Sequence, residues 1–183
     1  DSFHTVALVN QYLKMEAVEI VFVDSTLRGT MKMSGQRQKR FETMLEGKID
    51  LRPIDLYHHE DVDLYLVLNV DSKTHLKTIQ ILEQYKKPIF VDKPIFTNLD
   101  DFDTLSGKIM SSSGLRFTQF IKDVPLQEVI KIEGPLEYVD EVEGYFWYGI
   151  HLVEMLQTLT HDTIAIDSVA VFDTYEMVCG SSG

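Results

Sequence analysis

Few side chains in this sequence stand where they could bind a cofactor, and the first is Asp24. It ends the apolar, β-branched run Val18–Val23, which is typical of a buried strand. In a dinucleotide-binding fold, an acid about 20 residues after a glycine-rich turn binds the ribose hydroxyls and repels a 2′-phosphate. Asp24 therefore favours NAD, and NADP stays open because Arg28 could receive a phosphate. The alternative is an Asp that caps the next turn, and the sequence contains no G-x-G-x-x-G.

The histidines offer acid–base and metal chemistry. His151 begins an expected helix. The pKa of an unperturbed imidazole is about 6.5, which suits proton transfer near neutral pH. The alternative is that His151 only packs the start of that helix. His58-His59-Glu60 has the residue types of a metal site, but adjacent histidines on a loop seldom converge, so a solvated turn is the preferred interpretation. Cys179 has no basic or histidine neighbour in sequence that would activate its thiol.

Helix and strand patterns alternate over the first 110 residues. Apolar residues at helical spacing predict a helix from Phe3 to Leu13, with Asp1 and Ser2 as candidate caps. Buried strands are expected at 18–23, 64–68 and 89–91, and helices at 41–45, 76–85 and 97–109. The last helix opens with the capping box Thr97-Asn98-Leu99-Asp100 and would turn Leu99, Phe102, Leu105 and Ile109 inward. This alternation predicts an α/β fold, a Rossmann-like doubly wound parallel sheet.

The pattern changes beyond Ser111-Ser112-Ser113-Gly114, which reads as a domain boundary. Alternating segments at 127–133, 136–142, 164–172 and 174–179 predict strands, and 150–159 predicts a helix. We therefore expect a dinucleotide-binding domain at 1–112 and an α+β substrate and dimerisation domain with a mostly antiparallel sheet at 113–183. The opening strand and glycine-rich turn of a doubly wound domain are not among the 183 residues, and the second domain is expected to be incomplete.

Composition excludes several classes of protein. The chain of 183 residues has 17 basic and 29 acidic residues and a net charge of −12, which disfavours nucleic-acid binding. No apolar run approaches the ~20 residues that span a bilayer, and no signal-peptide pattern opens the chain, so no membrane contact is expected. One cysteine allows no internal disulfide, which fits a reducing compartment. The expected location is the cytoplasm.

Three motifs follow one another in a specific order. The strand LYLVLN runs into Val70-Asp71-Ser72-Lys73-Thr74-His75, the strand PIFV ends in Asp92-Lys93-Pro94, and the segment 144–154 begins a helix that contains His151. In this order they resemble the Gfo/Idh/MocA family (glucose–fructose oxidoreductase, inositol dehydrogenase and MocA), NAD(P)-dependent oxidoreductases. That family has a Thr-Pro-Asn-x-x-His turn, a strand ending in Glu-Lys-Pro, and a catalytic Asp and His four residues apart. The resemblance covers most of the chain.

The resemblance implies a role for each matched residue. Lys93 would lie near the nicotinamide and the reacting carbon, where its charge orients a substrate hydroxyl and lowers the hydroxyl pKa. Asp92 stands where the family has Glu, and Pro94 matches the family's proline; both would lie beside the cofactor. His151 matches the catalytic histidine, while Trp147 stands where the family has the partner Asp.

The remaining matches concern the cofactor turn and the substrate pocket. His75 matches the histidine of the turn near the cofactor, and its preferred interpretation is structural. Asn69 ends the strand before that turn and is expected at the cofactor. Trp147 and Tyr148, in an aromatic run, would line a substrate pocket or fill the domain junction. Glu154, one turn after His151, is a candidate replacement for the family's Asp.

Ligands of open α/β sheets bind beyond the carboxyl ends of the strands, so Asp24, Asn69 and Lys93 are expected at one rim. His151 would face that rim across a cleft. The function this implies is hydride transfer between a nicotinamide cofactor, NAD or NADP, and a sugar, polyol or related small carbonyl compound. The alternative is a non-catalytic relative that binds a dinucleotide or sugar as a sensor or assembly subunit. Either protein is expected to form a homodimer or homotetramer.

Overall fold

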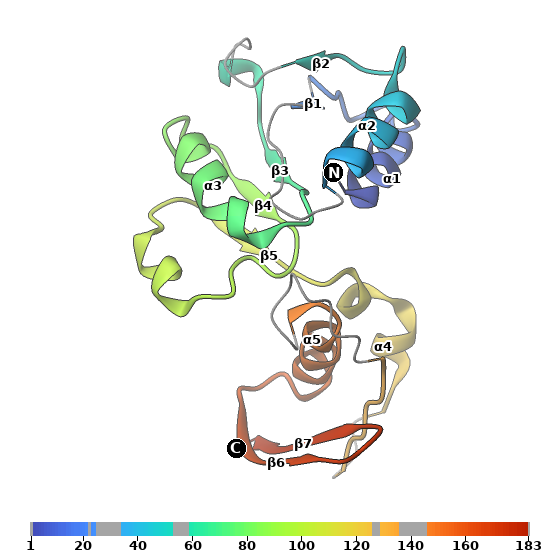
Figure 1. Cartoon of the computed structure of the whole chain (residues 1–183), viewed down its shortest axis with the longest axis vertical. Helices are drawn as coiled ribbons and strands as arrows, with labels where there is room; N and C mark the ends of the chain where they lie inside the picture. Colours follow the sequence, from blue (N-terminus) through green and yellow to red (C-terminus); the bar gives the residue numbers. More distant parts are fainter. Residues whose placement is uncertain are drawn as a thin grey trace. The chain divides into compact units, whose positions relative to one another are not determined.

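The computed structural model divides the chain into two compact units, residues 1–111 and 112–183 (Figure 1). It describes residues 2–21, 23–24, 34–52, 59–125, 129–135 and 146–182. The division falls inside the serine-rich stretch 111–114.

The first unit carries parallel strands connected through helices. In chain order its elements are α1 (Phe3–Tyr12), β1 (Val23–Asp24), α2 (Ser34–Leu45), β2 (Leu51–Arg52), η2 (His59–Asp61), β3 (Tyr65–Val67), η3 (Ser72–Thr74), α3 (His75–Glu83), β4 (Ile89–Val91), η4 (Leu99–Thr104) and β5 (Ile109–Ser111), where η marks a 3₁₀ helix. β3, β4 and β5 form a three-stranded parallel sheet, and β1 and β2 form a separate parallel pair. The mixed α/β class is confirmed. Within the described residues the parallel strands form two sheets, and a complete doubly wound sheet is not seen.

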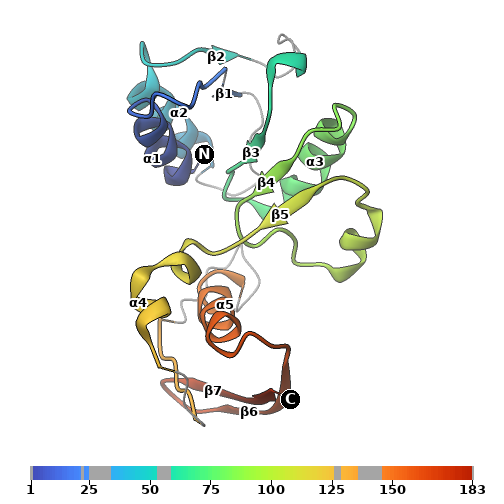
Figure 2. The ribbon, with the colours of Figure 1, turned by 180° about the vertical axis from the view of Figure 1, so that it is seen from behind.

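Two apolar clusters hold the first unit together. One joins β3 and β4 to α3 and includes Ile79, Ile89 and Val91, each at most 1% exposed. Burying one such side chain contributes about 1.5–3 kcal/mol of transfer free energy. The other cluster joins α1 to the end of α2 through Val6, Val9 and Leu45. α1 and α2 lie side by side in both views (Figures 1 and 2).

Several elements of the first unit follow the sequence patterns. Ser2 caps α1, because its hydroxyl accepts a hydrogen bond of 3.1 Å from the His4 amide. β3, α3 and β4 lie where the apolar periodicity predicts them. α2 begins at residue 34 and is therefore longer than the expected helix at 41–45. Residue 1 and residues 25–33 lie outside the described part of the chain.

Two predictions in the first unit are wrong. Of the expected strand at 18–23, residues 18–21 are irregular and Val23 belongs to β1, whose partner among the described residues, β2, is only two residues long. The expected helix at 97–109 is the short 3₁₀ helix η4, followed by β5. Asn98 does cap it, with 3.2 Å between its side-chain oxygen and the Asp100 amide, but Leu99 is 82% exposed. Three aspartates in six residues disfavour an α-helix because Asp side chains compete for backbone hydrogen bonds.

The second unit contains η5 (Gly114–Phe117), α4 (Gln119–Asp123), α5 (Gly149–Thr160), β6 (Ile164–Val171) and β7 (Glu176–Ser182). α5 and β6 confirm the predicted helix at 150–159 and strand at 164–172, and the two strands pair in an antiparallel manner, as expected. β7 overlaps the expected strand at 174–179 but begins and ends later in the sequence. The expected strand at 127–133 is wrong over its described part, because residues 129–133 are irregular. The expected strand at 136–142 lies outside the described residues. In the described part of the chain, the helices are too short or too polar to span a bilayer.

Candidate functional site

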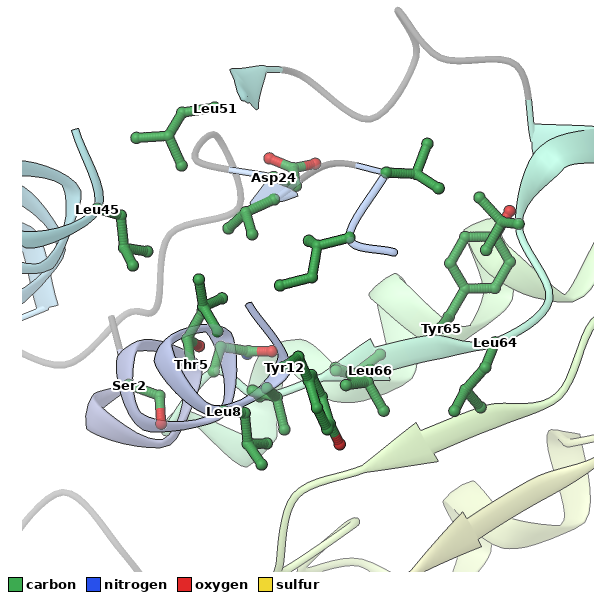
Figure 3. Close-up of a pocket in the computed structure, with 18 of the residues that line it drawn as sticks. Ser2, Thr5, Leu8, Tyr12, Asp24, Leu45, Leu51, Leu64, Tyr65 and Leu66 are labelled. Atoms are coloured by element: carbon green, nitrogen blue, oxygen red, sulfur yellow. The ribbon is translucent and has the colours of Figure 1, made fainter. Parts of the chain in front are cut away.

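The polar residues expected at the cofactor follow the ends of parallel strands in the first unit. β3 and β4 are neighbours in register, with Val67 opposite Val91. Asn69 follows β3 and Lys93 follows β4, so the backbone brings these two positions to the same edge of the sheet. Asp24 ends β1 and, like Asn69, lines a cavity of about 660 Å³ in this unit (Figure 3). The structure therefore places the three residues around one region of the first unit.

Asp92 follows β4 and contacts two other parts of the first unit. Its carboxyl group is nearly buried, and its backbone amide donates to the Val67 carbonyl at 2.8 Å, which ties the end of β4 to β3. Oδ1 accepts the Lys93 amide at 2.9 Å, and Oδ2 lies 2.5 Å from Nδ1 of His4. Both carboxylate oxygens are therefore engaged with neighbours on the protein, one of which is 88 residues away in the sequence.

The His4–Asp92 contact joins the first turn of α1 to the loop after β4. The hydrogen bond to Asp92 raises the pKa of His4 above its ordinary value of 6.5, with burial acting in the opposite direction. A cation near a helix N-terminus is disfavoured by the helix dipole, whereas a carboxylate there is favoured. Asp92 therefore supplies the negative charge that lets an imidazolium occupy this position.

Lys93 is half-buried beside this pair. Burial lowers the pKa of its ammonium group below 10.5, while the charge of Asp92 acts in the opposite direction. The Lys93–Pro94 peptide bond is cis, and Pro94 is buried. A partly desolvated ammonium near the end of a parallel strand is the kind of group that can bind and polarise a substrate oxygen.

His75 connects the two loops of this edge. It is fully buried at the start of α3, with Nε2 2.8 Å from the Asn69 carbonyl and Nδ1 3.0 Å from the Ile95 carbonyl. The Asn69 side-chain amide donates to the Asp71 carbonyl at 3.2 Å and to the Thr74 hydroxyl. Through these contacts His75 links the turn after β3 to the loop after β4, and Asn69 stabilises the turn after β3. Contact of either residue with a cofactor stays a prediction.

His151 lies in the second unit, on the first turn of α5. Its Nδ1 is 2.5 Å from the Ser113 hydroxyl, and Ser113 is fully buried. Glu154, the candidate orienting acid, binds elsewhere: Oε2 accepts the Ser112 hydroxyl at 3.0 Å, the Ser113 amide at 2.8 Å and Arg116 at 3.4 Å. The Ser113 hydroxyl is therefore one hydrogen-bond partner of this imidazole.

The aromatic pair of the second unit precedes α5. Trp147 and Tyr148 are partly buried, and their rings meet edge to face with centroids 6.1 Å apart. The Tyr148 carbonyl accepts the His151 amide at 3.0 Å. Lys93 and His151 belong to different units, so their action on one substrate stays a prediction, as does the pocket role of the two aromatic residues.

The solvated turn expected at His58-His59-Glu60 is wrong for His59. Its ring is buried, stacks on Tyr85 with centroids 3.7 Å apart, and holds the Tyr65 hydroxyl at 2.6 Å from Nδ1. Burial raises the pKa of Tyr65 to about 12. His58 lies outside the described residues, and among those that are described no cluster of His, Cys, Asp or Glu could hold a metal ion. His59 is a core residue that covers one end of β3.

Sequence patterns did not reveal two residues that contact the candidate site residues: His4, which contacts Asp92, and Ser113, which contacts His151. His4 sits on an exposed helical turn, and nothing local marks a partner 88 residues away. Ser113 lies in a serine-rich stretch that has the composition of a linker, and only its burial shows otherwise.

Comparison of the chain with protein-family models, curated proteins and solved structures finds no match.

Proposed function

We propose that this protein is an oxidoreductase of the Gfo/Idh/MocA type, which transfers hydride between a nicotinamide cofactor and a sugar, polyol or related small carbonyl compound. The observation that carries the proposal is Lys93, a partly buried ammonium directly after a parallel strand, on a turn fixed by Asp92. An ammonium in that position can donate a hydrogen bond to a substrate oxygen and stabilise the negative charge that grows there when an alcohol loses its proton.

The finer fold proposal is that the first unit belongs to a doubly wound, Rossmann-like domain. Its support is the direction and connection of the strands: β1 and β2 are parallel, β3, β4 and β5 are parallel, and helices or turns lead from each strand to the next. In such a domain the cofactor binds at the carboxyl ends of the strands, where Asp24, Asn69 and Asp92–Lys93 stand.

The residues present suit the ribose of a dinucleotide better than its pyrophosphate. Asp24, at the end of a parallel strand, has the position of the acid that binds the ribose hydroxyls. The glycine-rich turn that approaches a pyrophosphate is not among the 183 residues. When bound, the nicotinamide would supply the hydride chemistry, and Lys93 would orient the substrate oxygen.

A second candidate function is a dinucleotide- or sugar-binding relative without catalysis. Trp147 favours it, because it stands four residues before His151, where the resembled family has an aspartate. An aspartate at that position orients the imidazole and stabilises its protonated form, which an indole ring does not do. Proton transfer by His151 would then be weak, and binding would be the function that remains.

Self-association belongs to the same proposal. Ile166, Val169, Val171 and Val178 share one face of the β6–β7 hairpin, because Val169 pairs with Val178 and the register shift between Ile166 and Ser168 keeps the apolar residues in phase. Each of the four is at least 46% exposed. Exposed apolar sheet faces promote association, so the proposed occupant is the same face of a second copy.

One experiment separates the two candidate functions. The full chain is mixed with NAD or NADP and a panel of polyols and sugars, and reduced cofactor is followed by absorbance, while calorimetry measures cofactor binding. The enzyme hypothesis expects turnover that falls at least 100-fold in Lys93→Ala, with the dissociation constant of the cofactor changed less than about threefold. Lys77→Ala, on the exposed face of α3, is the matched control. Cofactor binding without turnover supports the second candidate. The absence of both rejects the enzyme and a dinucleotide-binding relative, and calorimetry with the same sugars and polyols then tests a sugar-binding relative.

A further inference from the structure

Ser113 lies near the start of the second unit, and its hydroxyl contacts two groups of that unit. The residue is fully buried. Its hydroxyl oxygen accepts the Leu115 amide at 3.2 Å, as the cap of η5, and lies 2.5 Å from Nδ1 of His151. Within the described residues these two contacts are all that this hydroxyl makes.

The number of donors and acceptors fixes the direction of the Ser113–His151 hydrogen bond. A serine hydroxyl has one hydrogen to donate and two lone pairs that accept. The Leu115 amide is itself a donor, so it occupies a lone pair and leaves the Ser113 hydrogen to be placed elsewhere. A buried hydroxyl hydrogen needs an acceptor, and in the described part of the chain that acceptor is Nδ1 of His151. The Ser113 hydroxyl therefore donates to Nδ1.

This direction determines where the proton of a neutral His151 ring is. A neutral imidazole has one N–H group and one nitrogen lone pair. Because the lone pair on Nδ1 accepts the Ser113 hydroxyl, the ring proton is on Nε2. The opposite arrangement, in which Nδ1–H donates to the serine oxygen, leaves the buried hydroxyl hydrogen without an acceptor, and this cost disfavours it at least fivefold.

Glu154 holds the Ser113 backbone in place for this hydrogen bond. It stands on α5 three residues after His151, and its side chain is largely buried. Oε2 accepts the Ser113 amide at 2.8 Å and the Ser112 hydroxyl at 3.0 Å, and Arg116 lies 3.4 Å from the same oxygen. The amide and the hydroxyl of Ser113 are thus bound to two side chains of one helix, less than a turn apart.

We propose that Ser113 is a positioning residue that fixes neutral His151 as the Nε2–H tautomer, so that this imidazole donates a hydrogen bond to a substrate oxygen and does not act as the base. The role toward substrate rests on the proposed hydride transfer. While Ser113 donates to Nδ1, neither nitrogen of the neutral ring has a lone pair for a substrate proton. An N–H donor at Nε2 stabilises the negative charge that grows on the oxygen in the transition state.

The tautomer is measured by long-range ¹H–¹⁵N correlation NMR of the ¹⁵N-labelled full chain, without cofactor or substrate, at about pH 9, where imidazole is neutral. The His151 signals are identified by their loss in His151→Gln. The expected result is a protonated Nε2 and an unprotonated Nδ1, with a ratio of Nε2–H to Nδ1–H that falls at least fivefold in Ser113→Ala. Ser112→Ala removes a neighbouring buried hydroxyl that donates to Glu154, and as the matched control it is expected to change the ratio less than twofold.

Nδ1–H as the main neutral form of the natural chain would overturn the proposal, and this result needs no variant. An unchanged ratio in folded Ser113→Ala would overturn it as well, because the serine would then not set the tautomer. Ser113→Cys is the second variant: it keeps the shape of the side chain with a weaker donor, and its ratio is expected to fall in the same direction.

Turnover separates a donor from a base at His151. Glutamine supplies a side-chain N–H but does not take up a proton, whereas leucine does neither. His151→Gln is expected to keep at least tenfold more kcat/KM than His151→Leu, and an equal loss in the two variants would overturn the donor role. Absence of turnover in the natural chain would reject hydride transfer together with the donor role that rests on it, and the NMR measurement would still decide the tautomer.

Discussion

Replacing Lys93 with methionine is expected to stabilise the first unit while it removes turnover. Burial is the main cause that lowers the pKa of the Lys93 ammonium, so the fold bears a cost for holding this charge at neutral pH. Methionine keeps an unbranched apolar stem of similar length and removes the charge. A residue at a strand end whose side chain lowers the stability of the fold is more typical of a functional role than of a structural one.

The expected gain is about 0.5–1 kcal/mol, the lower part of the range for single stabilising substitutions. Lys93 is only half-buried, so water screens part of its charge, and Asp92 offsets another part. For a domain of this size the gain corresponds to about 2–6 °C in the unfolding temperature of the unit.

The assay is urea unfolding followed by circular dichroism between pH 7 and 11. Because the folded-state pKa of Lys93 is below the unfolded-state pKa, folding binds fewer protons between the two, and the stability of the natural chain rises with pH in that window. The advantage of Lys93→Met is therefore largest below the folded-state pKa and shrinks as pH approaches 10.5.

Lys77→Met on the exposed face of α3 is the matched control and is expected to change stability by less than about 0.5 kcal/mol at every pH. A Lys93→Met variant that is less stable than the natural chain would refute the reasoning. An advantage that does not change with pH would refute it as well, since the gain would then come from packing and not from charge.

Four further predictions address other parts of the molecule. Calorimetry is expected to show tighter binding of NAD than of NADP, and Asp24→Ala should reduce that preference, because the acid repels a 2′-phosphate; tighter NADP in the natural chain would contradict it. The stability contributed by His4 is present below pH 6.5 and lost as pH rises through its raised pKa, so His4→Asn should flatten the unfolding profile across that window, and an unaltered profile would count against the ion pair. Gly180→Ala should cost about 1–3 kcal/mol, since a Cβ would lie 2.4 Å from a β6 carbonyl, whereas Gly114→Ala meets nothing within 4 Å and should be neutral. Light scattering should show at least a dimer at micromolar concentration and a monomer for Val171→Lys, and a monomeric natural chain would reject the proposed face.

Periodicity was sufficient where an element buries one continuous apolar face. β3, α3 and β4 have that property, and each lies where its pattern indicates. α5 and the strands β6 and β7 also lie close to where their patterns indicate, although most of their residues are not buried. η4 departs from its pattern because it buries no continuous apolar face: Leu99 is 82% exposed, and Phe102, which packs edge to face on Phe96, is still 43% exposed. The spacing of apolar residues therefore predicts a helix reliably only where tertiary packing of its apolar face stabilises that helix.

The sequence was sufficient to predict which residues of the candidate site follow strand ends. It was not sufficient to predict which side chains contact those residues. The position of Lys93 after a buried strand is a local property of the sequence, but its neighbour Asp92 pairs with a histidine 88 residues away. The burial of His59 is equally non-local, since it depends on Tyr65 and Tyr85 from two later segments. Hydrogen bonds of this kind come from the folded chain and leave no periodic signal in the sequence.

The central claim, hydride transfer assisted by Lys93, is tested most directly by isotope transfer. The full chain is incubated with NADH that carries two deuterium atoms at C4 and with a panel of small sugars and carbonyl compounds, and the products are analysed by mass spectrometry. The account predicts an alcohol product with one deuterium on the former carbonyl carbon, formed by the natural chain and at least 100-fold more slowly by Lys93→Ala. Deuterium transfer that is absent from every product, or equally fast in the two proteins, would contradict it.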